Sequence, residues 1–387
     1  MTQDLTAPEA ATAISLDRAD ARPSVGGLVD YDRIPLADDA DPFAVHAAHE
    51  LYERLIGLWA PALIEAAHDL DVFAELSHGP AAASGVSAAL GTDLQATRVL
   101  LDALHAYGLL DRSGTERDGH RYHLAPHISE CTTAGGPLSL VGKFLHDRHV
   151  AWPAWSRLAE TVRHGAHRSG GGWSENQIST DDYRSLAGGI SFWAPPIIEL
   201  LATELDRRGW AAGRRRSVLD IGCGAGAYVH LLLRRFPAWS GTGFDAGPIA
   251  AIAEDSAEGL GLSDRFAAQV GDFWKDPWPQ QQDLILFGNI FHLQPRARAQ
   301  ELARLAAGSL APGGLVCIID QIRVDEGERS TPQDRFALLF AASMLATGGG
   351  DTYRLEAYDK WLERAGLERV GLIDAPMHRI LLAEHSA

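Results

Sequence analysis

The apolar residues of this chain recur with a helical period in its first half and in short blocks in its second half. Between residues 45 and 112 they stand three and four positions apart, as in LYERLIGLWAPALIEAAHDLDVFAEL, which predicts amphipathic helices. Thr92, at the start of TDLQATRVLLDALHAYGLL, is a good N-cap. The segment DRSGTERDGHRYHLAP then predicts a turn and a short strand, so the first part of the chain has a winged-helix-like pattern.

From residue 217 onward, short apolar strands alternate with helices, as in a doubly wound α/β sheet. Only the three residues APM separate the last two strands, which are too few for a parallel crossover, so an antiparallel hairpin closes the chain. We therefore predict a seven-stranded α/β sheet with a reversed last strand, preceded by a mainly helical domain. The expected strands are residues 217–221, 240–244, 266–270, 283–289, 314–320, 367–374 and 378–384.

The change of pattern divides the chain into three parts. Residues 1–44 have little periodicity and are expected to form a flexible extension. Residues 45–210 are expected to form a helical dimerisation and lid domain, with a loop at RSGGGW (residues 168–173), and residues 211–387 form the sheet domain. At 387 residues with 46% hydrophobic content, the chain is long enough for two folded parts.

The charge of the chain disfavours nucleic acid and anionic membranes as partners. It carries 34 basic and 51 acidic residues, a net charge of −17. Residues 92–110, which include the recognition helix of a winged-helix regulator, offer Arg98 as the only cation against Asp93 and Asp102. We expect neither partner.

The cysteines and the N-terminus favour a cytoplasmic protein. Cys131, Cys223 and Cys317 are far apart and form no C-x-x-C pair. The N-terminus lacks a basic and apolar leader, and no apolar run approaches the ~20 residues that a membrane span needs.

No metal is expected, because the two histidine clusters of the sequence lack the spacing and the third ligand of a metal site. These clusters are His120, His123 and His127, and His146 and His149.

A glycine-rich turn follows the first predicted strand in VLDIGCGAGAY (residues 218–228). Gly222, Gly224 and Gly226 leave the backbone bare at the head of a helix, where a nucleotide-like ligand can lie. With Ala227 the turn also fits the dinucleotide fingerprint G-x-G-x-x-[GA]. Asp220 beside the turn opposes a pyrophosphate and suits an amino group. The long helical first part, VGDFW after the third strand and the closing hairpin also point away from NAD.

Together with GDF, LAPGGLV and the Gly-Gly-x-acid element in TGGGDTY, these features resemble the class I S-adenosylmethionine-dependent methyltransferases. More narrowly, the chain from about residue 45 onward resembles the small-molecule O-methyltransferase family, which includes plant caffeic acid methyltransferases and bacterial natural-product tailoring enzymes. The resemblance implies S-adenosylmethionine as cofactor, bound by residues 211–387, and a homodimer formed through residues 45–210.

The resemblance also implies the cofactor contacts. Asp245 ends the second strand 19 residues after Gly226, where a carboxylate accepts both ribose hydroxyl hydrogens. Asp272 approaches the adenine amine and Phe273 the adenine ring. The full set is Asp220, Gly222, Gly224, Gly226, Asp245, Asp272, Phe273 and Asn289.

A general base suits the methylation of a phenol, whose pKa near ~10 keeps it protonated at neutral pH. His292 ends the fourth strand in LILFGNIFHLQP, at the edge where open α/β sheets hold their ligands, and matches the family's catalytic histidine. It can equally be a turn residue. The family continues His-Asp-Trp, whereas this chain reads HLQP.

Two carboxylates are candidates for holding the second ring nitrogen of His292. Asp320 in CIIDQI ends the fifth strand at the same edge, and Asp351 follows the glycines of TGGGDTY. Both match acidic positions of the family, but glutamate is common at the second. Because aspartate is one methylene shorter, we expect the His292–Asp320 contact more than the His292–Asp351 contact.

Apolar residues supply candidates for the acceptor pocket. The segment RFALLFAASMLA matches the family's acceptor-facing helix and puts Phe336, Phe340 and Met344 four apart on one face. Trp155, Phe192 and Trp193, in the helical region 138–208, line the pocket or belong to the ordinary core. An apolar wall favours an aromatic small molecule as acceptor.

We therefore predict S-adenosylmethionine-dependent methyl transfer to a hydroxyl of an aromatic small molecule in specialised, antibiotic-type metabolism, with His292 as the general base. Transfer to carbon or nitrogen of a similar acceptor remains open. So do a methyltransferase-fold enzyme that uses the cofactor without methyl transfer and a ligand-sensing winged-helix regulator.

Overall fold

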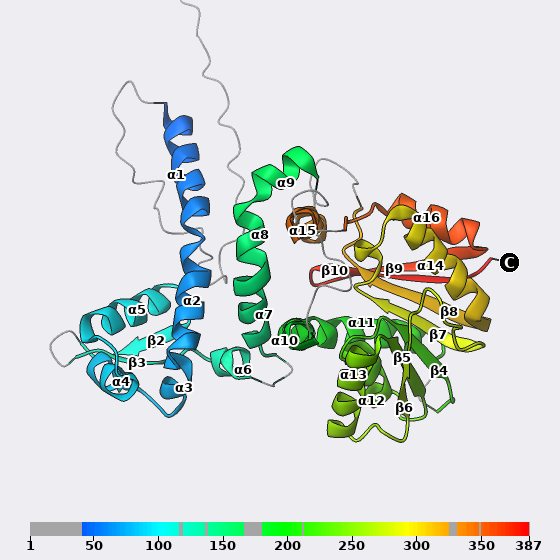
Figure 1. Cartoon of the computed structure of the whole chain (residues 1–387), viewed down its shortest axis with the longest axis horizontal. Helices are drawn as coiled ribbons and strands as arrows, with labels where there is room; N and C mark the ends of the chain where they lie inside the picture. Colours follow the sequence, from blue (N-terminus) through cyan, green and yellow to red (C-terminus); the bar gives the residue numbers. More distant parts are fainter. Residues whose placement is uncertain are drawn as a thin grey trace, which may run out of the picture. The chain divides into compact units, whose positions relative to one another are not determined.

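The computed structural model describes residues 41–386 except 116–118, 135, 137, 166–179, 211–212, 325–330 and 348–349. The described residues divide between a compact unit that ends at Pro126 and one that begins at His127 (Figure 1). The predicted extension 1–44 falls almost entirely outside the described residues, and the predicted loop 168–173 falls wholly outside them.

The first unit is helical with a small antiparallel sheet of order β1-β3-β2. Its core contains Leu101 and Leu104 of the fifth helix and Tyr122 of the sheet. That helix begins after Asp93, not after Thr92 as predicted, because the Asp93 Oδ1 accepts the Ala96 N–H at 2.8 Å. The elements are α1 (Pro42–Ile56), α2 (Trp59–Asp69), α3 (Val72–Ser77), β1 (Ala81–Ala82), α4 (Ala83–Leu90), α5 (Leu94–Ala106), β2 (Leu110–Ser113) and β3 (Arg121–Leu124).

The second unit contains a seven-stranded sheet of order β6-β5-β4-β7-β8-β10-β9. Strands β4 to β8 pair in parallel, and β10 runs antiparallel to both of its neighbours. This confirms the predicted sheet with its closing hairpin. The strands are β4 (Ser217–Ile221), β5 (Ser240–Asp245), β6 (Phe266–Val270), β7 (Gln282–Gly288), β8 (Leu310–Asp320), β9 (Leu367–Ala375) and β10 (His378–His385).

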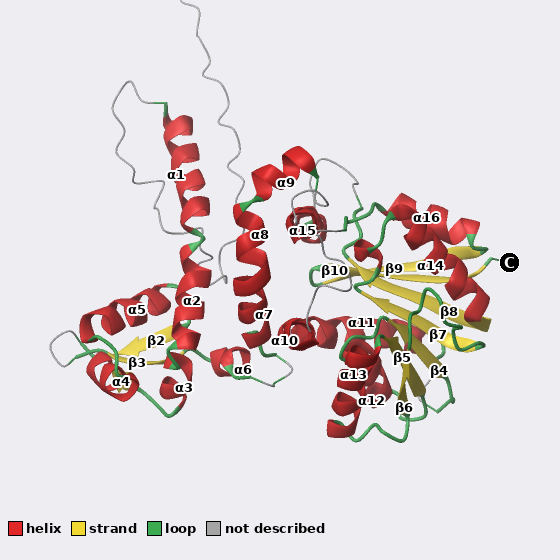
Figure 2. Ribbon diagram, in the orientation of Figure 1, coloured by secondary structure: helices red, strands yellow, loops and turns green. Residues whose placement is uncertain are grey.

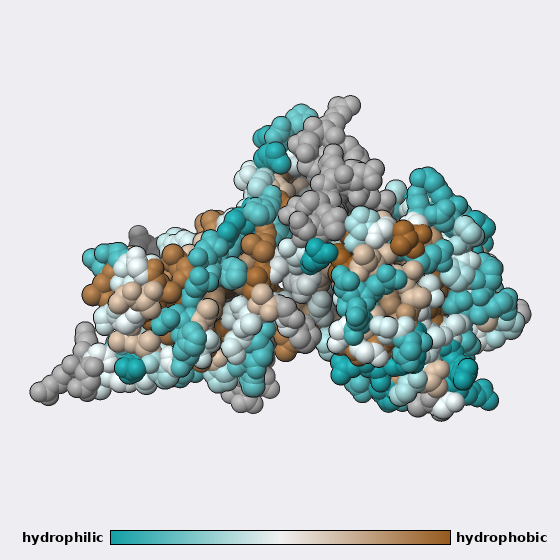
Figure 3. Space-filling view, turned by 60° about the horizontal axis from the view of Figure 1, so that its bottom comes forward, coloured by the Kyte–Doolittle hydropathy of each residue, from teal (hydrophilic) through white to brown (hydrophobic). Residues whose placement is uncertain are grey.

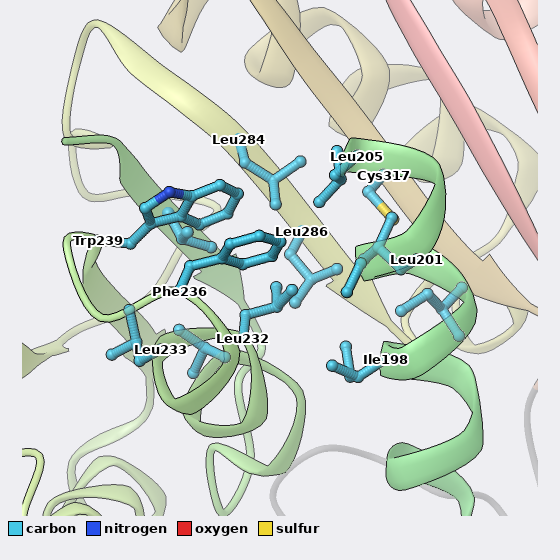
Figure 4. Close-up of a cluster of buried hydrophobic side chains, with 14 of the residues drawn as sticks. Ile198, Leu201, Leu205, Leu232, Leu233, Phe236, Trp239, Leu284, Leu286 and Cys317 are labelled. Atoms are coloured by element: carbon cyan, nitrogen blue, oxygen red, sulfur yellow. The ribbon is translucent and has the colours of Figure 1, made fainter. Parts of the chain in front are cut away.

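Helices cover both faces of this sheet (Figure 2). On one face, α11 (Ala194–Arg207), α12 (Ala227–Arg235) and α13 (Gly247–Gly259) bury their apolar sides against the strands. Figure 4 shows this core, in which α11 contributes Leu201 and Leu205 beside Phe236 and Trp239. On the other face, α14 (Arg296–Ser309) and α16 (Leu355–Arg364) pack in the same way.

The remaining helical elements of the second unit precede α11, lie between β7 and α14, or follow β8. They are α6 (Ile128–Thr132), α7 (Val141–His146), a π-helical turn (Asp147–Ala151), α8 (Trp152–Ser156), α9 (Leu158–His164), α10 (Thr180–Ile190), a 3₁₀ turn (Ser191–Trp193), η4 (Phe291–Leu293) and α15 (Pro332–Thr347). The boundary between the two compact units therefore falls within the predicted helical domain 45–210, whose part from His127 onward belongs to the same unit as the sheet.

One helical stretch, Tyr183–Arg207, is long and apolar enough to cross a membrane by length and composition alone. The expectation from the sequence that no apolar run approaches the length of a membrane span was therefore wrong for this stretch. The α11 part of the stretch buries Ile197, Leu201 and Leu205 in the core and leaves Glu199 and Leu200 exposed, as an amphipathic helix that packs on a sheet does. The face of the molecule in Figure 3 shows hydrophobic residues exposed among hydrophilic ones.

Candidate active site

The glycine turn between β4 and α12 has a backbone that only glycine adopts readily. Gly222, Gly224 and Gly226 have φ values of 66°, 58° and 76°, in the left-handed region. A Cβ on Gly224 would lie 2.7 Å from the Tyr183 hydroxyl, and a Cβ on Gly222 would collide with the Ile290 side chain. Side chains at these positions are therefore excluded twice, by conformation and by space.

Asp245, the last residue of β5, borders this turn. Its Oδ2 accepts the Gly224 N–H at 2.9 Å, and its Oδ1 accepts the Ala246 N–H at 2.8 Å. The carboxylate is thus fixed at the carboxyl ends of the parallel strands, where such sheets hold nucleotides.

Asp220 carries a polar atom that has lost its contact with water. The residue is 1% exposed, and its Oδ2 has no hydrogen-bond partner. Burial, reinforced by the negative charge of Asp245, raises the pKa of Asp220 well above its ordinary value. A cationic amino group at the turn would supply the absent partner. The residues present therefore fit S-adenosylmethionine, which carries an ammonium group.

Tyr183 reaches the same turn from α10 and was not among the residues predicted from the sequence. Its hydroxyl lies near Gly224, and burial, together with Asp245, Cys223 and Asp220, raises the pKa of the phenol. Only the packing of α10 over the turn reveals this residue, because no motif surrounds it.

The side chain of Asp272, predicted to approach adenine, has local partners. Its Oδ1 accepts the Trp274 N–H at 2.9 Å, and its Oδ2 accepts a hydrogen bond from Lys275 Nζ at 2.6 Å. The Lys275 contact is the largest cause that lowers the pKa of Asp272. Phe273 lies closer to the turn, since its ring would be 4.0 Å from a Cβ on Gly222.

His292 and Asp320 form a buried pair at the carboxyl edge of the sheet. The His292 Nδ1 donates to Asp320 Oδ1 at 2.8 Å, and the His292 N–H donates to Oδ2 at 3.0 Å. Because the carboxylate only accepts, the ring proton sits on Nδ1 and Nε2 carries the lone pair. Burial alone would raise the pKa of Asp320, but His292 and the backbone N–H donors hold it below its ordinary value.

Asp351 meets His292 through the backbone. The Asp351 N–H donates to the His292 carbonyl at 2.9 Å, while its side chain is exposed. Gly350 packs so closely on that carbonyl that a Cβ would collide with it. Among the described residues, Asp320 is the carboxylate that hydrogen-bonds the His292 ring.

A chain of aromatic rings begins at His292. Phe340 meets the His292 ring at a centroid distance of 5.0 Å, and Phe336 stacks on Phe340 at 5.7 Å. Trp193 then contacts Phe336 at 6.4 Å and Phe192 at 5.7 Å. Four of the predicted pocket residues are thus brought together.

The other two predicted pocket residues lie apart from these ring contacts within the described part of the chain. Met344 is one helical turn beyond Phe340 on α15 and is half-buried. Trp155 lies on α8 with 42% of its surface exposed. Their assignment to the pocket stays a prediction.

Asn289, predicted to contact the cofactor, enters a polar cluster that the sequence did not indicate. Its Nδ2 donates to the Tyr228 hydroxyl at 2.9 Å. Its Oδ1 lies 3.2 Å from Gln321 Nε2 and 2.9 Å from His378 Nε2. Gln321 and His378 were not identified from the sequence, because the β8–β10 pairing brings them together.

The fold and the site define a class of enzyme. A seven-stranded sheet with a reversed last strand, an acidic glycine turn, a carboxylate after the second strand and a buried His–Asp pair at the same edge are the features of a class I methyltransferase.

Comparison with known proteins identifies the family. An O-methyltransferase domain model matches residues 211–368, and an O-methyltransferase dimerisation domain model matches residues 52–133. The chain belongs to the S-adenosylmethionine-dependent O-methyltransferase family: it is a methyltransferase (EC 2.1.1.-) that uses S-adenosylmethionine to O-methylate small molecules.

Individual relatives span most of the chain. The 3-hydroxy-5-methyl-1-naphthoate 3-O-methyltransferase of Streptomyces sahachiroi is 28% identical over 329 residues, which cover 83% of this chain and 89% of the relative. The acetylserotonin O-methyltransferase of Mus musculus is 28% identical over 343 residues, covering 84% and 86%. The crystal structure of human N-acetylserotonin methyltransferase in complex with SAM matches with a TM-score of 0.76 and 21% identity, covering 91% of this chain and all of the other, and shows the same fold.

Proposed function

We propose that this enzyme methylates a hydroxyl of an aromatic small molecule in specialised metabolism and that His292 is the general base. The observation that carries the proposal is the buried His292–Asp320 pair at one end of a chain of aromatic side chains. The names of two relatives, which act on a hydroxynaphthoate and on acetylserotonin, support an aromatic acceptor.

In this proposal the chain aligns the acceptor and removes its proton. When bound, S-adenosylmethionine supplies a methyl group that is already activated on a sulfonium. Nε2 of His292 accepts the proton of the acceptor hydroxyl, whose pKa near ~10 would otherwise keep it protonated. Asp320 fixes the ring tautomer and stabilises the imidazolium that forms. Phe336, Phe340 and Trp193 bind the aromatic ring and exclude water.

The label of a methyl-labelled cofactor tests the transfer itself. With a phenolic acceptor, label is expected in an aryl methyl ether. Label on nitrogen or carbon would point to the alternative acceptor atoms. Label that stays in the cofactor while the acceptor changes would contradict methyl transfer and favour an enzyme that only retains the cofactor.

Asp245 is proposed to bind the ribose hydroxyls of the cofactor. In this proposal the glycine turn beside it holds the methionine part, and Asp220 lies near the ammonium group. Asp245→Ala is expected to weaken S-adenosylhomocysteine binding by about 10- to 100-fold, because hydrogen bonds to a charged group are lost. Titration calorimetry measures this, with the exposed Asp255→Ala on α13 as the control. Heat on adding NADH, with none on adding S-adenosylhomocysteine, would reject the assigned cofactor site.

We propose that the enzyme is a homodimer formed through its dimerisation domain. The stripe Leu51, Tyr52, Leu55, Leu58 and Trp59 follows the helical period and is exposed, with Leu55 67% accessible. Leu55→Glu is expected to convert dimer to monomer, since it buries a charge in an apolar contact. Light scattering after gel filtration measures this. The exposed Leu260→Glu on the second unit should stay dimeric, and an unchanged dimer in Leu55→Glu would exclude this face.

A cytoplasmic location is also proposed. Cys131, Cys223 and Cys317 are all free thiols, which suits a reducing compartment. Fractionation of the producing cells tests this location.

A further inference from the structure

Two side chains near the proposed acceptor pocket each carry one buried polar atom that has no hydrogen-bond partner. Gln321 is 1% exposed, and its Oε1 has no partner. The Nε1 of Trp193 is likewise buried and unpartnered. One atom is an acceptor and the other a donor. Buried polar atoms are nearly always paired, so each such exception calls for a partner.

The rest of the polar cluster holds the Gln321 side chain in place. Its Nε2 lies 2.9 Å from His378 Nε2 and 3.2 Å from Asn289 Oδ1. Asn289 is itself held by the Tyr228 hydroxyl. These contacts use the amide nitrogen of Gln321 and leave its carbonyl oxygen available.

Ring contacts connect this cluster to the base. Trp193 meets the His378 ring at 4.8 Å and Phe336 at 6.4 Å. Phe336 leads to Phe340, which contacts His292. In this series of contacts the aromatic residues proposed to bind the acceptor have polar neighbours: His292 beside Phe340, and His378 with Gln321 beside Trp193.

We propose that Gln321 and Trp193 form a second polar subsite, which binds a hydroxyl group of the acceptor other than the one that is methylated. A hydroxyl has both the proton that Gln321 Oε1 would accept and the lone pair that Trp193 Nε1 would bind, whereas an ether lacks the proton and a methyl group lacks both. This inference rests on the proposed aromatic acceptor and deepens it: the substrate is an aromatic molecule with at least two hydroxyls. Asn289 and His378 are positioning residues for Gln321.

The test compares naphthalene-2,7-diol with 2-naphthol. Calorimetry in the presence of S-adenosylhomocysteine gives their affinities without any dependence on methyl transfer. We expect the wild-type enzyme to bind the diol about tenfold more tightly than 2-naphthol, because one hydrogen-bonded group changes the affinity by about this factor. In Trp193→Phe, which removes the donor and keeps an aromatic ring, the ratio should fall toward one. Gln321→Leu, which removes the acceptor, should lower it likewise.

Controls separate the subsite from effects on folding. Gln300→Leu on α14, where the amide pairs with Arg364, should keep the tenfold ratio. If Gln321→Leu fails to fold in a thermal scan, Trp193→Phe carries the test. Equal affinities in the wild type, or a ratio that survives in the folded variants, would overturn the subsite. Binding of neither compound would reject it together with the aromatic acceptor, while the labelled-methyl experiment would still report transfer.

Discussion

Replacing His292 with alanine is expected to lower kcat by about 10²- to 10⁴-fold, the range that general-base catalysis contributes. The affinity for S-adenosylhomocysteine should stay unchanged, because the His292 ring hydrogen-bonds Asp320 and not the glycine turn. The loss should shrink as the pH is raised toward the acceptor pKa near ~10, where the phenol ionises without a base. Single-turnover rates across pH, with calorimetry for the cofactor, measure both effects.

Two further variants test whether His292 acts as the base. Asp320→Asn keeps the size of the side chain but can present an N–H to the His292 ring, which favours the wrong tautomer, so it should also lose most of the activity. His385→Ala, at the exposed end of β10, should retain full turnover. An unchanged kcat in His292→Ala would refute the assigned base.

Replacing Arg379 with methionine is expected to destabilise the protein by about 3–5 kcal/mol, because it leaves a buried carboxylate without its cation. Nη1 and Nη2 of Arg379 donate to Asp334 at 2.6 and 3.1 Å, and Nε donates to Asp374 at 2.8 Å. Nη1 also donates to the Ile322 carbonyl, so Arg379 ties β10 to the segment after β8 and to the start of α15. Urea unfolding of the two proteins at neutral pH measures the difference.

The loss of stability caused by Arg379→Met should become smaller as the pH falls. Burial alone would raise the pKa of Asp334, but hydrogen bonds from Arg379 and Thr331, among others, lower it to about 2. The unfolded value is near ~3.9, so this stabilisation is complete above that pH and is lost as the pH falls toward 2. The gap between wild type and variant should therefore narrow in acid.

A surface pair supplies the control for Arg379→Met. Arg369 also makes two hydrogen bonds to a carboxylate, that of Asp359, but both side chains are partly exposed. Arg369→Met should cost less than about 1 kcal/mol. Equal losses in the two variants would contradict the role given to burial.

The sequence was sufficient for those parts of the site that lie within one motif. The glycine turn, Asp245 at the end of β5 and His292 after β7 were found because each follows a strand, and strand ends meet at one edge of a parallel sheet. Asp320 followed from the same rule, and its contact with His292 has the predicted preference over Asp351.

Residues that act through tertiary packing were not predictable in this way. Tyr183 comes from a helix without a motif. Gln321 and His378 are 57 positions apart in the sequence and meet only because β8 pairs with β10. Asp351 was placed near His292 by its motif, but the sequence did not show that the contact is made by the backbone. A single sequence carries no signal for such contacts.

The closing hairpin also limits how this enzyme can be altered. His378 and Arg379 are consecutive in β10, one contacting Trp193 and the other Asp334. Since neighbouring side chains of a strand point to opposite faces, adding or deleting one residue in the two-residue turn before them would turn His378 away from Gln321 and Arg379 away from Asp334. Hairpins transplanted from relatives to change acceptor preference must therefore differ from this one by an even number of turn residues.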